Sequence, residues 1–300
     1  MAQPTNLANQ IEERLPQGTL TLLQAAGKVA SSQKQTLYLV GGTVRDLMLG
    51  RPNFDLDLVV EGDAPTLAHQ LAQDSGGEVI IHSRFRTAKF RQENLSIDLA
   101  TTRTETYHRP GALPTVRPGS IADDLLRRDL SINAMAVCLN PNRYGELLDL
   151  HEGKSDLNCH LIRILHQKSF IDDATRILRA LRYEQRLGFK LELNTRNLIC
   201  RDVSMLHTIS GDRIRHEIEL ILKEEYPERV LQRAEELGVL SELHPALKGD
   251  GWLAKKFEQA RHSTAHAPSH SLYLSLLIYP LTRDDCKQFI DRLRIPKMTA

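Results

Sequence analysis

Two aspartates alternate with apolar residues in the stretch FDLDLVV, at positions 54–60. Successive side chains of a β-strand point to opposite faces, so Asp55 and Asp57 would share one face while the apolar residues pack on the other. Carboxylate oxygens are the ligands that Mg²⁺ prefers, and two such ions can steady the attacking and leaving oxygens of a phosphoryl transfer. The pattern therefore predicts a metal-binding strand, although the solvated face of an edge strand alternates in the same way.

A third carboxylate lies further along the chain, in LSIDLA at positions 95–100. There Asp98 points away from the face shared by its apolar neighbours. If this strand lies beside the strand at 54–60, three carboxylates converge, and Asp98 becomes a candidate for assisting deprotonation of an attacking hydroxyl.

Two adjacent glycines, Gly41 and Gly42, follow a predicted strand and open a predicted helix in VGGTVRD. Glycines at such a turn let backbone N–H groups approach a phosphate at the helix N-terminus. The Walker A pattern is missing. The alternative is a tight turn without ligand, with Arg45 and Asp46 as a surface ion pair of little energetic consequence.

Two later motifs could contact a nucleotide. In RRDLSINAMA, Arg128 and Asp129 stand at the start of a predicted helix and Asn133 one turn on, where a carboxylate and an amide can hydrogen-bond a ribose 2′-hydroxyl. In DDATRILRALRY, Asp173 and Arg176 are three residues apart on one predicted helical face. Each motif has a plainer interpretation, a capped amphipathic helix and an acidic first turn respectively.

Composition limits the other possibilities. A length of 300 residues favours two or more domains, and a net charge of only +1 argues against wholesale nucleic-acid binding. The four cysteines and twelve histidines show no metal-ligand spacing. No run approaches eighteen apolar residues, and the first residues lack a basic region followed by an apolar one, so we expect a cytoplasmic protein without membrane contact.

The periodicity changes once along the chain. Short strand patterns dominate from 37 to about 165, with helical pieces near 64–74 and 124–134, which predicts a mixed α/β domain on one sheet. After 170 the apolar residues follow helical spacing. The expected helices span 194–204, 211–225, 227–238, 251–264, 271–279 and 283–293. Residues 103–124 form a long irregular segment, which is usually functional or mobile.

These motifs together carry a resemblance. LYLVGGTVRDLMLGRPNFDLDLVVEGD resembles the head motif of the class II tRNA nucleotidyltransferases and bacterial poly(A) polymerases, within the polymerase-beta-like superfamily, and the resemblance extends from about 35 to 250. It implies an α+β fold: a nucleotidyltransferase head with a mixed sheet and flanking helices, followed by an all-helical neck and body. We expect a helical lead-in at 1–35, the head at 36–168, the neck with a nucleotide-selecting template helix at 169–240, and at 241–300 the start of a body that relatives continue further.

The resemblance also assigns roles. It implies two metal ions, Mg²⁺ with Mn²⁺ able to substitute, on Asp55 and Asp57, and Asp98 as the third catalytic carboxylate. The implied nucleotide-binding residues are Gly41, Gly42, Arg45, Arg128, Asp129, Asn133, Asp173, Arg176 and Arg179. A neighbouring motif, GDRIRHEIELIL at 211–222, would supply an arginine and a glutamate that brace the template helix.

In the resembled enzymes the matching aspartate and arginine read the Watson–Crick edge of the incoming base. A carboxylate accepts from an exocyclic amine and a guanidinium donates to a ring nitrogen or carbonyl, so one pair could select CTP and ATP and reject GTP and UTP. Asp172 stands where the family pattern has a glutamate, which leaves Asp173 and Arg176 untouched. A local excess of five positive charges over 160–201 would suit an RNA end, or be a solvated helix face.

The expected activity is template-independent addition of CCA, or its terminal A, to the 3′ end of tRNA from CTP or ATP, with release of pyrophosphate. Poly(A) synthesis on other RNA and CC addition remain open, as does the oligomeric state. In the resembled enzymes a flexible element at 103–124 governs the switch to adding A, which favours use of ATP. A glycosyltransferase using Asp-x-Asp would leave the later motifs unexplained, and a degenerate RNA-binding homologue would need no carboxylates.

Overall fold

The computed structural model describes residues 5–52, 55–263 and 266–296. The chain divides into two compact units. Unit 1 comprises 1–106 and 115–159, and unit 2 comprises 107–114 and 160–300. The segment 107–114 therefore leaves unit 1, belongs to unit 2, and returns.

Unit 1 is built on one seven-stranded sheet with the order β3-β4-β5-β2-β1-β8-β9. Its strands are β1 (Thr36–Val40), β2 (Leu56–Glu61), β3 (Glu78–His82), β4 (Thr87–Gln92), β5 (Leu95–Thr101), β8 (Met135–Cys138) and β9 (Leu147–Asp149). β2 and β5 run parallel, and the other neighbouring pairs are antiparallel. The expected mixed sheet is confirmed, and with it the adjacency of the two aspartate-bearing strands.

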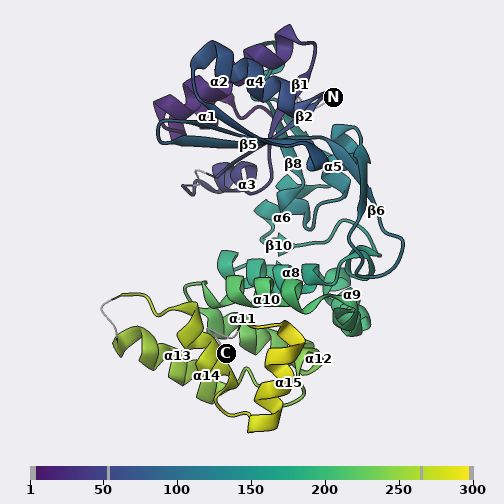
Figure 1. Ribbon diagram of the computed structural model, residues 1–300, viewed down its shortest axis with the longest axis vertical. Coiled ribbons are helices and arrows are strands. Elements are labelled where there is room, and N and C mark those ends of the chain that lie inside the picture. Colours follow the sequence, from purple (N-terminus) through teal and green to yellow (C-terminus); the bar gives the residue numbers. More distant parts are fainter. Residues whose placement is uncertain (1–4, 53–54, 264–265, 297–300) are drawn as a thin grey trace. The chain divides into compact units, whose positions relative to one another are not determined.

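Helices cover both faces of this sheet (Figure 1). They are α1 (Ala8–Arg14), α2 (Gln17–Ser32), α3 (Gly42–Leu49), α4 (Ala64–Ser75), α5 (Ile121–Leu126) and α6 (Gly153–Asn158). α2 packs on β1, and α4 packs on β4 and β5. α5 packs on the other face, in a cluster with Tyr38, Val40 and Val59. Val59 shares its face of β2 with Asp57, so the apolar packing under α5 continues along the strand into the aspartates.

The segment 103–124 is more regular than its prolines suggest. β6 (Arg103–Thr106) and β7 (Thr115–Pro118) pair as an antiparallel hairpin, and the expectation of an irregular segment is wrong for these residues. The two strands are short and largely polar, so no hydrophobic alternation marks them in the sequence.

The helix expected near 124–134 is also wrong in its extent. α5 ends at Leu126, and a single 3₁₀ turn, Ser131–Asn133, follows. The carboxylate of Asp129 accepts a hydrogen bond from the N–H of Leu130 at 2.8 Å. Such local bonding competes with a helical backbone, so Arg128 and Asp129 lie between two elements and not at a helix start.

Unit 2 is helical apart from one small sheet. Its helices are α7 (Ser169–Asp172), α8 (Thr175–Leu187), α9 (Leu193–Asp202), α10 (Gly211–Leu222), α11 (Pro227–Glu236), α12 (Val239–Leu243), α13 (Gly251–Ser263), α14 (His270–Ile278) and α15 (Arg283–Leu293). β10 (Leu161–Ile162) pairs with β11 (Lys190–Leu191) here, so the end of the strand-rich stretch expected from 37 to about 165 does not join the large sheet. α8 packs against α10 and α11. The helices expected from 194 onward are confirmed within a few residues.

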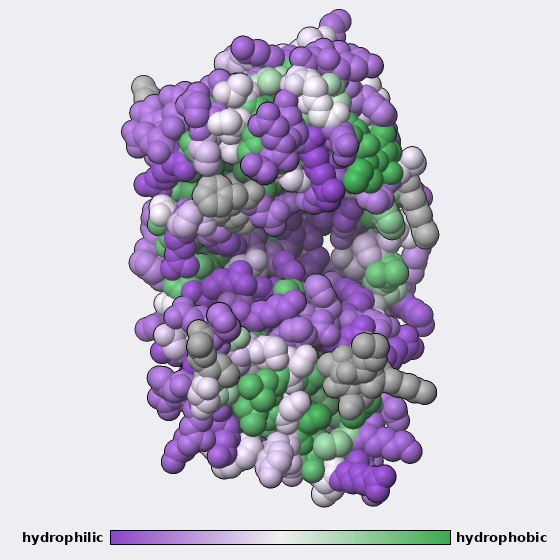
Figure 2. Space-filling view, turned by 60° about the vertical axis from the view of Figure 1, so that its left-hand side comes forward, coloured by the Kyte–Doolittle hydropathy of each residue, from purple (hydrophilic) through white to green (hydrophobic). Residues whose placement is uncertain are grey.

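The surface of the described residues is mainly polar. Figure 2 shows hydrophilic residues over much of the visible face, with apolar residues in separate patches. Trp252 and Tyr279 are exposed in unit 2 and stack on each other with ring centroids 6.1 Å apart. No helix in the described ranges is both long and apolar enough to cross a membrane.

Close packing of α2 gives a test of unit 1. A Cβ atom added to Gly27 would lie 2.0 Å from the carbonyl oxygen of Leu139, a backbone atom that cannot rotate away. We expect Gly27→Ala to destabilise the protein by about 1–3 kcal/mol, the usual cost of overpacking. Thermal unfolding measures it. Gly251→Ala is the control, because among the described residues a Cβ added there meets no atom of a packed neighbour within 4 Å, and an equal loss in both variants would contradict the contact.

Candidate active site

Asp55, Asp57 and Asp98 lie near the N-terminal end of β2 and on the neighbouring part of β5. In the parallel register Asp57 lies directly opposite Asp98, and Asp55 comes immediately before β2. Asp55 and Asp57 are exposed, and the side chain of Asp98 is 48% exposed. Phe54, expected on the apolar face, lies outside the described residues, while Leu56 and Leu58 are buried as expected. The predicted alternation is confirmed over the described part of this strand.

Lys89 is a member of this group that the sequence did not reveal. It pairs with Asp98 across β4 and β5, and its Nζ lies 3.1 Å from Oδ2 of Asp98. Within the described ranges no three His, Cys, Asp or Glu side chains gather so as to hold a metal ion. The ion pair with Lys89 occupies Oδ2 of Asp98.

Like charges define the electrostatics of this edge. The pKa of Asp57 is raised above 3.8, first by the protein atoms that surround the carboxylate and then by Asp55, with Asp98 adding to the rise. Arg128 and Lys89 oppose it. A divalent cation would relieve the same repulsion, so the donor set suits a hard metal ion with oxygen ligands.

The glycine turn lies against these carboxylates. Gly41 precedes α3 with φ of +72°, a conformation that favours glycine. A Cβ there would meet Nη1 of Arg128 at 2.9 Å and Oδ2 of Asp57 at 3.9 Å. Gly42 is the first residue of α3. The structure thus brings the glycine turn, Arg128 and the aspartates together, as the sequence predicts.

Arg45 is buried and does not form the expected surface pair. Only 4% of it is exposed; its Nε and Nη2 donate to both carboxylate oxygens of Asp46, and its Nη1 donates to Oδ1 of Asn133 at 2.5 Å. Asn133 in turn donates to Asp129 at 3.2 Å. These four side chains form a buried network behind the glycine turn, so Arg45, Asp129 and Asn133 are in a position to shape the site from within.

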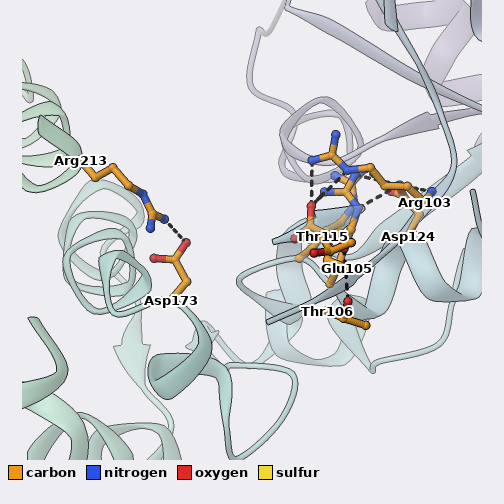
Figure 3. Close-up of polar contacts among 9 residues, drawn as sticks. Arg103, Glu105, Thr106, Thr115, Asp124, Asp173 and Arg213 are labelled. Carbon is orange, nitrogen blue, oxygen red and sulfur yellow. Dashed lines mark hydrogen bonds and ion pairs between the residues drawn. The ribbon is translucent and has the colours of Figure 1, made fainter. Parts of the chain in front are cut away.

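Asp173 lies in a break between helices. It follows α7 with extended backbone (φ −148°, ψ 97°), and its Oδ1 accepts from the N–H and hydroxyl of Thr175 as α8 begins. Its Oδ2 accepts from Nη2 of Arg213 at 2.5 Å (Figure 3). The expectation that Asp173 and Arg176 share a helical face is therefore wrong, because the acidic residue serves the start of the helix from outside it.

The other two predicted arginines of α8 have different surroundings. Arg176 is 5% exposed and donates to Oγ of Ser169 at 2.8 Å. The Arg179 side chain is 33% exposed and lies 3.5 Å from Oε1 of Glu217 on α10, which also binds the buried Arg182 at 3.2 Å. Arg213 and Glu217 thus brace the helix from α10, as the motif GDRIRHEIELIL predicts. Arg182 was missed because an arginine in a long basic helix has no distinguishing signal.

Known protein families match both units. The family described as the poly A polymerase head domain matches residues 37–163, and the one described as the probable RNA and SrmB-binding site of polymerase A matches 188–250. A solved structure titled the apo form II of CCA-adding enzyme aligns over 100% of this chain and 73% of its own, with 33% identity and a TM-score of 0.90. The chain belongs to the tRNA nucleotidyltransferase and poly(A) polymerase family. Members are transferases, and the family is in general dependent on divalent metal ions.

Other relatives in this family are named by the end that they build. The A-adding tRNA nucleotidyltransferase of Halalkalibacterium halodurans is 44% identical over 239 residues, which are 78% of this chain and 56% of that protein. The structure of the Thermotoga maritima CCA-adding enzyme complexed with tRNA aligns over 100% of this chain and 72% of its own, with 32% identity and a TM-score of 0.85. The chain spans about half the length of that A-adding relative.

The raised pKa of Asp57 gives a pH-dependent prediction. Because the folded-state pKa lies above the unfolded value, the charged carboxylate costs stability at pH 7, and the cost disappears as the pH falls through the folded pKa toward 3.8. Asp57→Asn should therefore raise the melting temperature at pH 7, and the difference from wild type should vanish near pH 3.8. Differential scanning calorimetry across this pH range measures both.

A control of opposite sign is available in unit 1. Hydrogen bonds from Thr66 and Arg86 lower the pKa of Asp63, so its charged form contributes stability at neutral pH that is lost in acid. Asp63→Asn should lower the melting temperature at pH 7. If the melting temperature at pH 7 fell in both variants, removing the charge of Asp57 would not relieve the repulsion, and the prediction would be contradicted.

Proposed function

We propose that this protein adds nucleotides, including the terminal A, to the 3′ end of tRNA without a nucleic-acid template. The observation that carries the proposal is the placement of Asp57 opposite Asp98, with Asp55 two residues earlier, beside the glycine turn and Arg128. Carboxylates for a metal, a backbone turn for phosphate and an arginine for its charge are the parts that nucleotidyl transfer requires.

In this proposal Asp55 and Asp57 hold two Mg²⁺ ions, and Mn²⁺ could replace them. When bound, the ions neutralise the triphosphate and steady the attacking and leaving oxygens of the transfer. The chain's own groups do the rest. Gly41, Gly42 and Arg128 hold the triphosphate, with the Arg128 Nε a buried donor that has no hydrogen-bond partner among the described residues.

Asp98 acts on the attacking hydroxyl of the RNA. Its carboxylate accepts the proton of the 3′-hydroxyl as that oxygen bonds to the α-phosphate and pyrophosphate leaves. In the structure Nζ of Lys89 lies 3.1 Å from Oδ2 of Asp98. For Asp98 to accept the proton, Lys89 releases this oxygen or shares it with the hydroxyl. Arg45, Asp129 and Asn133 bind the ribose and fix the shape of the turn through their buried network.

Base selection belongs to α8 and the break before it. Asp173 accepts from the exocyclic amine of ATP or CTP, and Arg176 donates to a ring acceptor, with Arg179 beside them. Three of about four lone-pair sites on Asp173 are already used, two by Thr175 and one by Arg213, which fixes the plane of the carboxylate. A fixed carboxylate discriminates better than a mobile one, because a wrong base leaves it unpaired.

The relatives support tRNA as the acceptor and ATP as a substrate. The A-adding enzyme of H. halodurans shares 44% of the aligned residues, and the aligned T. maritima structure is a complex with tRNA. The test uses labelled ATP and CTP with Mg²⁺ on transcripts ending before CCA, after C and after CC, plus an unrelated RNA. A on the CC-ended transcript alone identifies an A-adding enzyme, growth to CCA on all three identifies a CCA-adding one, and no incorporation on any RNA contradicts the proposal.

Two substitutions test the catalytic assignment. Asp57→Ala should reduce incorporation by at least about 1,000-fold, because a metal ligand cannot be replaced by solvent without loss of transition-state charge stabilisation. Its circular dichroism spectrum should match wild type, since the side chain is exposed. Asp74→Ala, on the exposed face of α4, is the matched control and should retain normal rates. Normal rates in Asp57→Ala would refute the metal role.

Arg213 tests base selection. Arg213→Ala should reduce the preference for ATP over GTP by about tenfold, the equivalent of one charge-assisted hydrogen bond, because Oδ2 of Asp173 then loses its partner and only the Thr175 bonds to Oδ1 still hold the carboxylate. The measurement is the ratio of kcat/KM values on a CC-ended tRNA. Arg215→Ala, on the same helix but bonded to the carbonyls of Leu293 and Arg294, should leave the ratio unchanged. If the ratio of kcat/KM for ATP over GTP is the same in the Arg213 variant and in wild type, Arg213 does not contribute to base selection.

A further inference from the structure

Asp124 is a buried carboxylate that the proposed chemistry does not use. Its side chain has no exposed area, although α5 is a short surface helix. Oδ1 accepts from Nε and Nη2 of Arg127 at 3.1 and 2.8 Å, and Oδ2 accepts from Nη2 of Arg128 at 3.0 Å. A fully buried charge is retained only when it is paired, and here both oxygens are paired with guanidinium groups.

Glu105 extends this ion network to the hairpin. Its side chain, on β6, is 7% exposed, and Oε1 accepts from Nη2 of Arg103 at 2.8 Å and from Nη1 of Arg127 at 3.3 Å. Figure 3 shows Glu105 and Asp124 beside Arg103. Arg127 thus bridges the carboxylate of the hairpin and the carboxylate of α5.

Arg128 stands at the far end of the same network. Asp124 holds its Nη2, while its Nη1 reaches the Gly41 turn near Asp57. A guanidinium is a rigid fork, so fixing one arm sets the direction of the other. Without this partner, the long Arg128 side chain would lose rotamer freedom each time it bound a phosphate, and affinity would fall.

We propose that Asp124 is a positioning residue that orients the Arg128 side chain toward the triphosphate. Glu105 links this orientation to the β6–β7 hairpin. This inference rests on the proposed function. The hairpin tip, 107–114, belongs to unit 2, where the carbonyl of Gly111 accepts from Nη1 of Arg213 at 3.4 Å. Arg213 also holds Asp173, so the tip of the hairpin and Asp173 share one arginine within unit 2.

The test separates phosphate binding from base selection. Inorganic tripolyphosphate, which has no base, is titrated calorimetrically into the full-length protein. Asp124→Asn should weaken tripolyphosphate binding by about tenfold or more, the equivalent of one charge-assisted hydrogen bond. Its residual incorporation should keep the wild-type ratio of ATP to GTP. A merely structural role would instead loosen the site as a whole and degrade that ratio together with the affinity.

Two further variants, a second test and a matched control, allow the inference to be tested even if Asp124→Asn does not fold. Glu105→Gln leaves Asp124 and Arg128 paired, so it should fold and weaken tripolyphosphate binding in the same direction by about threefold. Asp123→Asn is the matched control, because Asp123 is the exposed neighbour of Asp124 and bonds only to Ser120 in the helix cap. It should bind tripolyphosphate as wild type does. If Asp124→Asn does not fold, Glu105→Gln decides alone.

Wild-type affinity in Glu105→Gln and in folded Asp124→Asn would overturn the inference while leaving the proposed function standing. Absence of nucleotide incorporation by the wild-type protein on every RNA would instead contradict the proposed function, whatever the tripolyphosphate titrations show. Wild-type protein that incorporates ATP but does not bind tripolyphosphate would also overturn the inference, because Arg128 would then not be a phosphate ligand.

Discussion

The register between β2 and β5 is the constraint on which the site depends. Parallel pairing sets Asp57 directly against Asp98, and a slip of one residue would turn the carboxylates toward the apolar core. Like charges at neighbouring positions destabilise a sheet, and after burial the nearby carboxylates of Asp55 and Asp98 contribute to the raised pKa of Asp57. The apolar faces of β1 and β2, packed under helices on both sides, hold the two strands in this unfavourable register. The active edge is therefore stable only because of the core behind it.

Each of the two units also contains buried charged groups that form ion pairs. Arg45 with Asp46, Asp124 with two arginines, and Glu217 with Arg182 are all buried or nearly so. Buried pairs add little net stability compared with apolar packing, but removal of either partner is costly. These pairs orient side chains, because each fixes a side chain of a predicted nucleotide-binding element. The candidate site of unit 1 thus combines exposed carboxylates with buried ion pairs.

The sequence predicted the positions of the candidate site aspartates better than those of the residues that hold the site residues in place. Alternation in FDLDLVV and LSIDLA gave the faces of Asp57 and Asp98 because strand periodicity is local. The break at Asp173 and the early end of α5 were missed, since in both places a side chain bonds the backbone locally and interrupts a helical pattern. Lys89 was not singled out because its partner Asp98 is 9 residues away on another strand. Asp124 was not singled out because its arginine partners, three and four residues on, look like the charged pairs of an ordinary amphipathic helix. Side-chain partners across elements need the fold.

The hairpin tip has a consequence for how such proteins are divided. Residues 107–114 belong to the helical unit although they are flanked on both sides by the sheet unit. Gly111 there has φ of +69°, and a Cβ on it would lie 2.4 Å from Oγ1 of Thr208. The backbone thus passes between the units three times, and a single proteolytic cut near 160 leaves eight residues of the helical unit on the sheet fragment. If recombination exchanged the sheet unit between relatives, residues 107–114 would move with it and would have to fit the helical unit of the other protein. The two units are therefore constrained to evolve together.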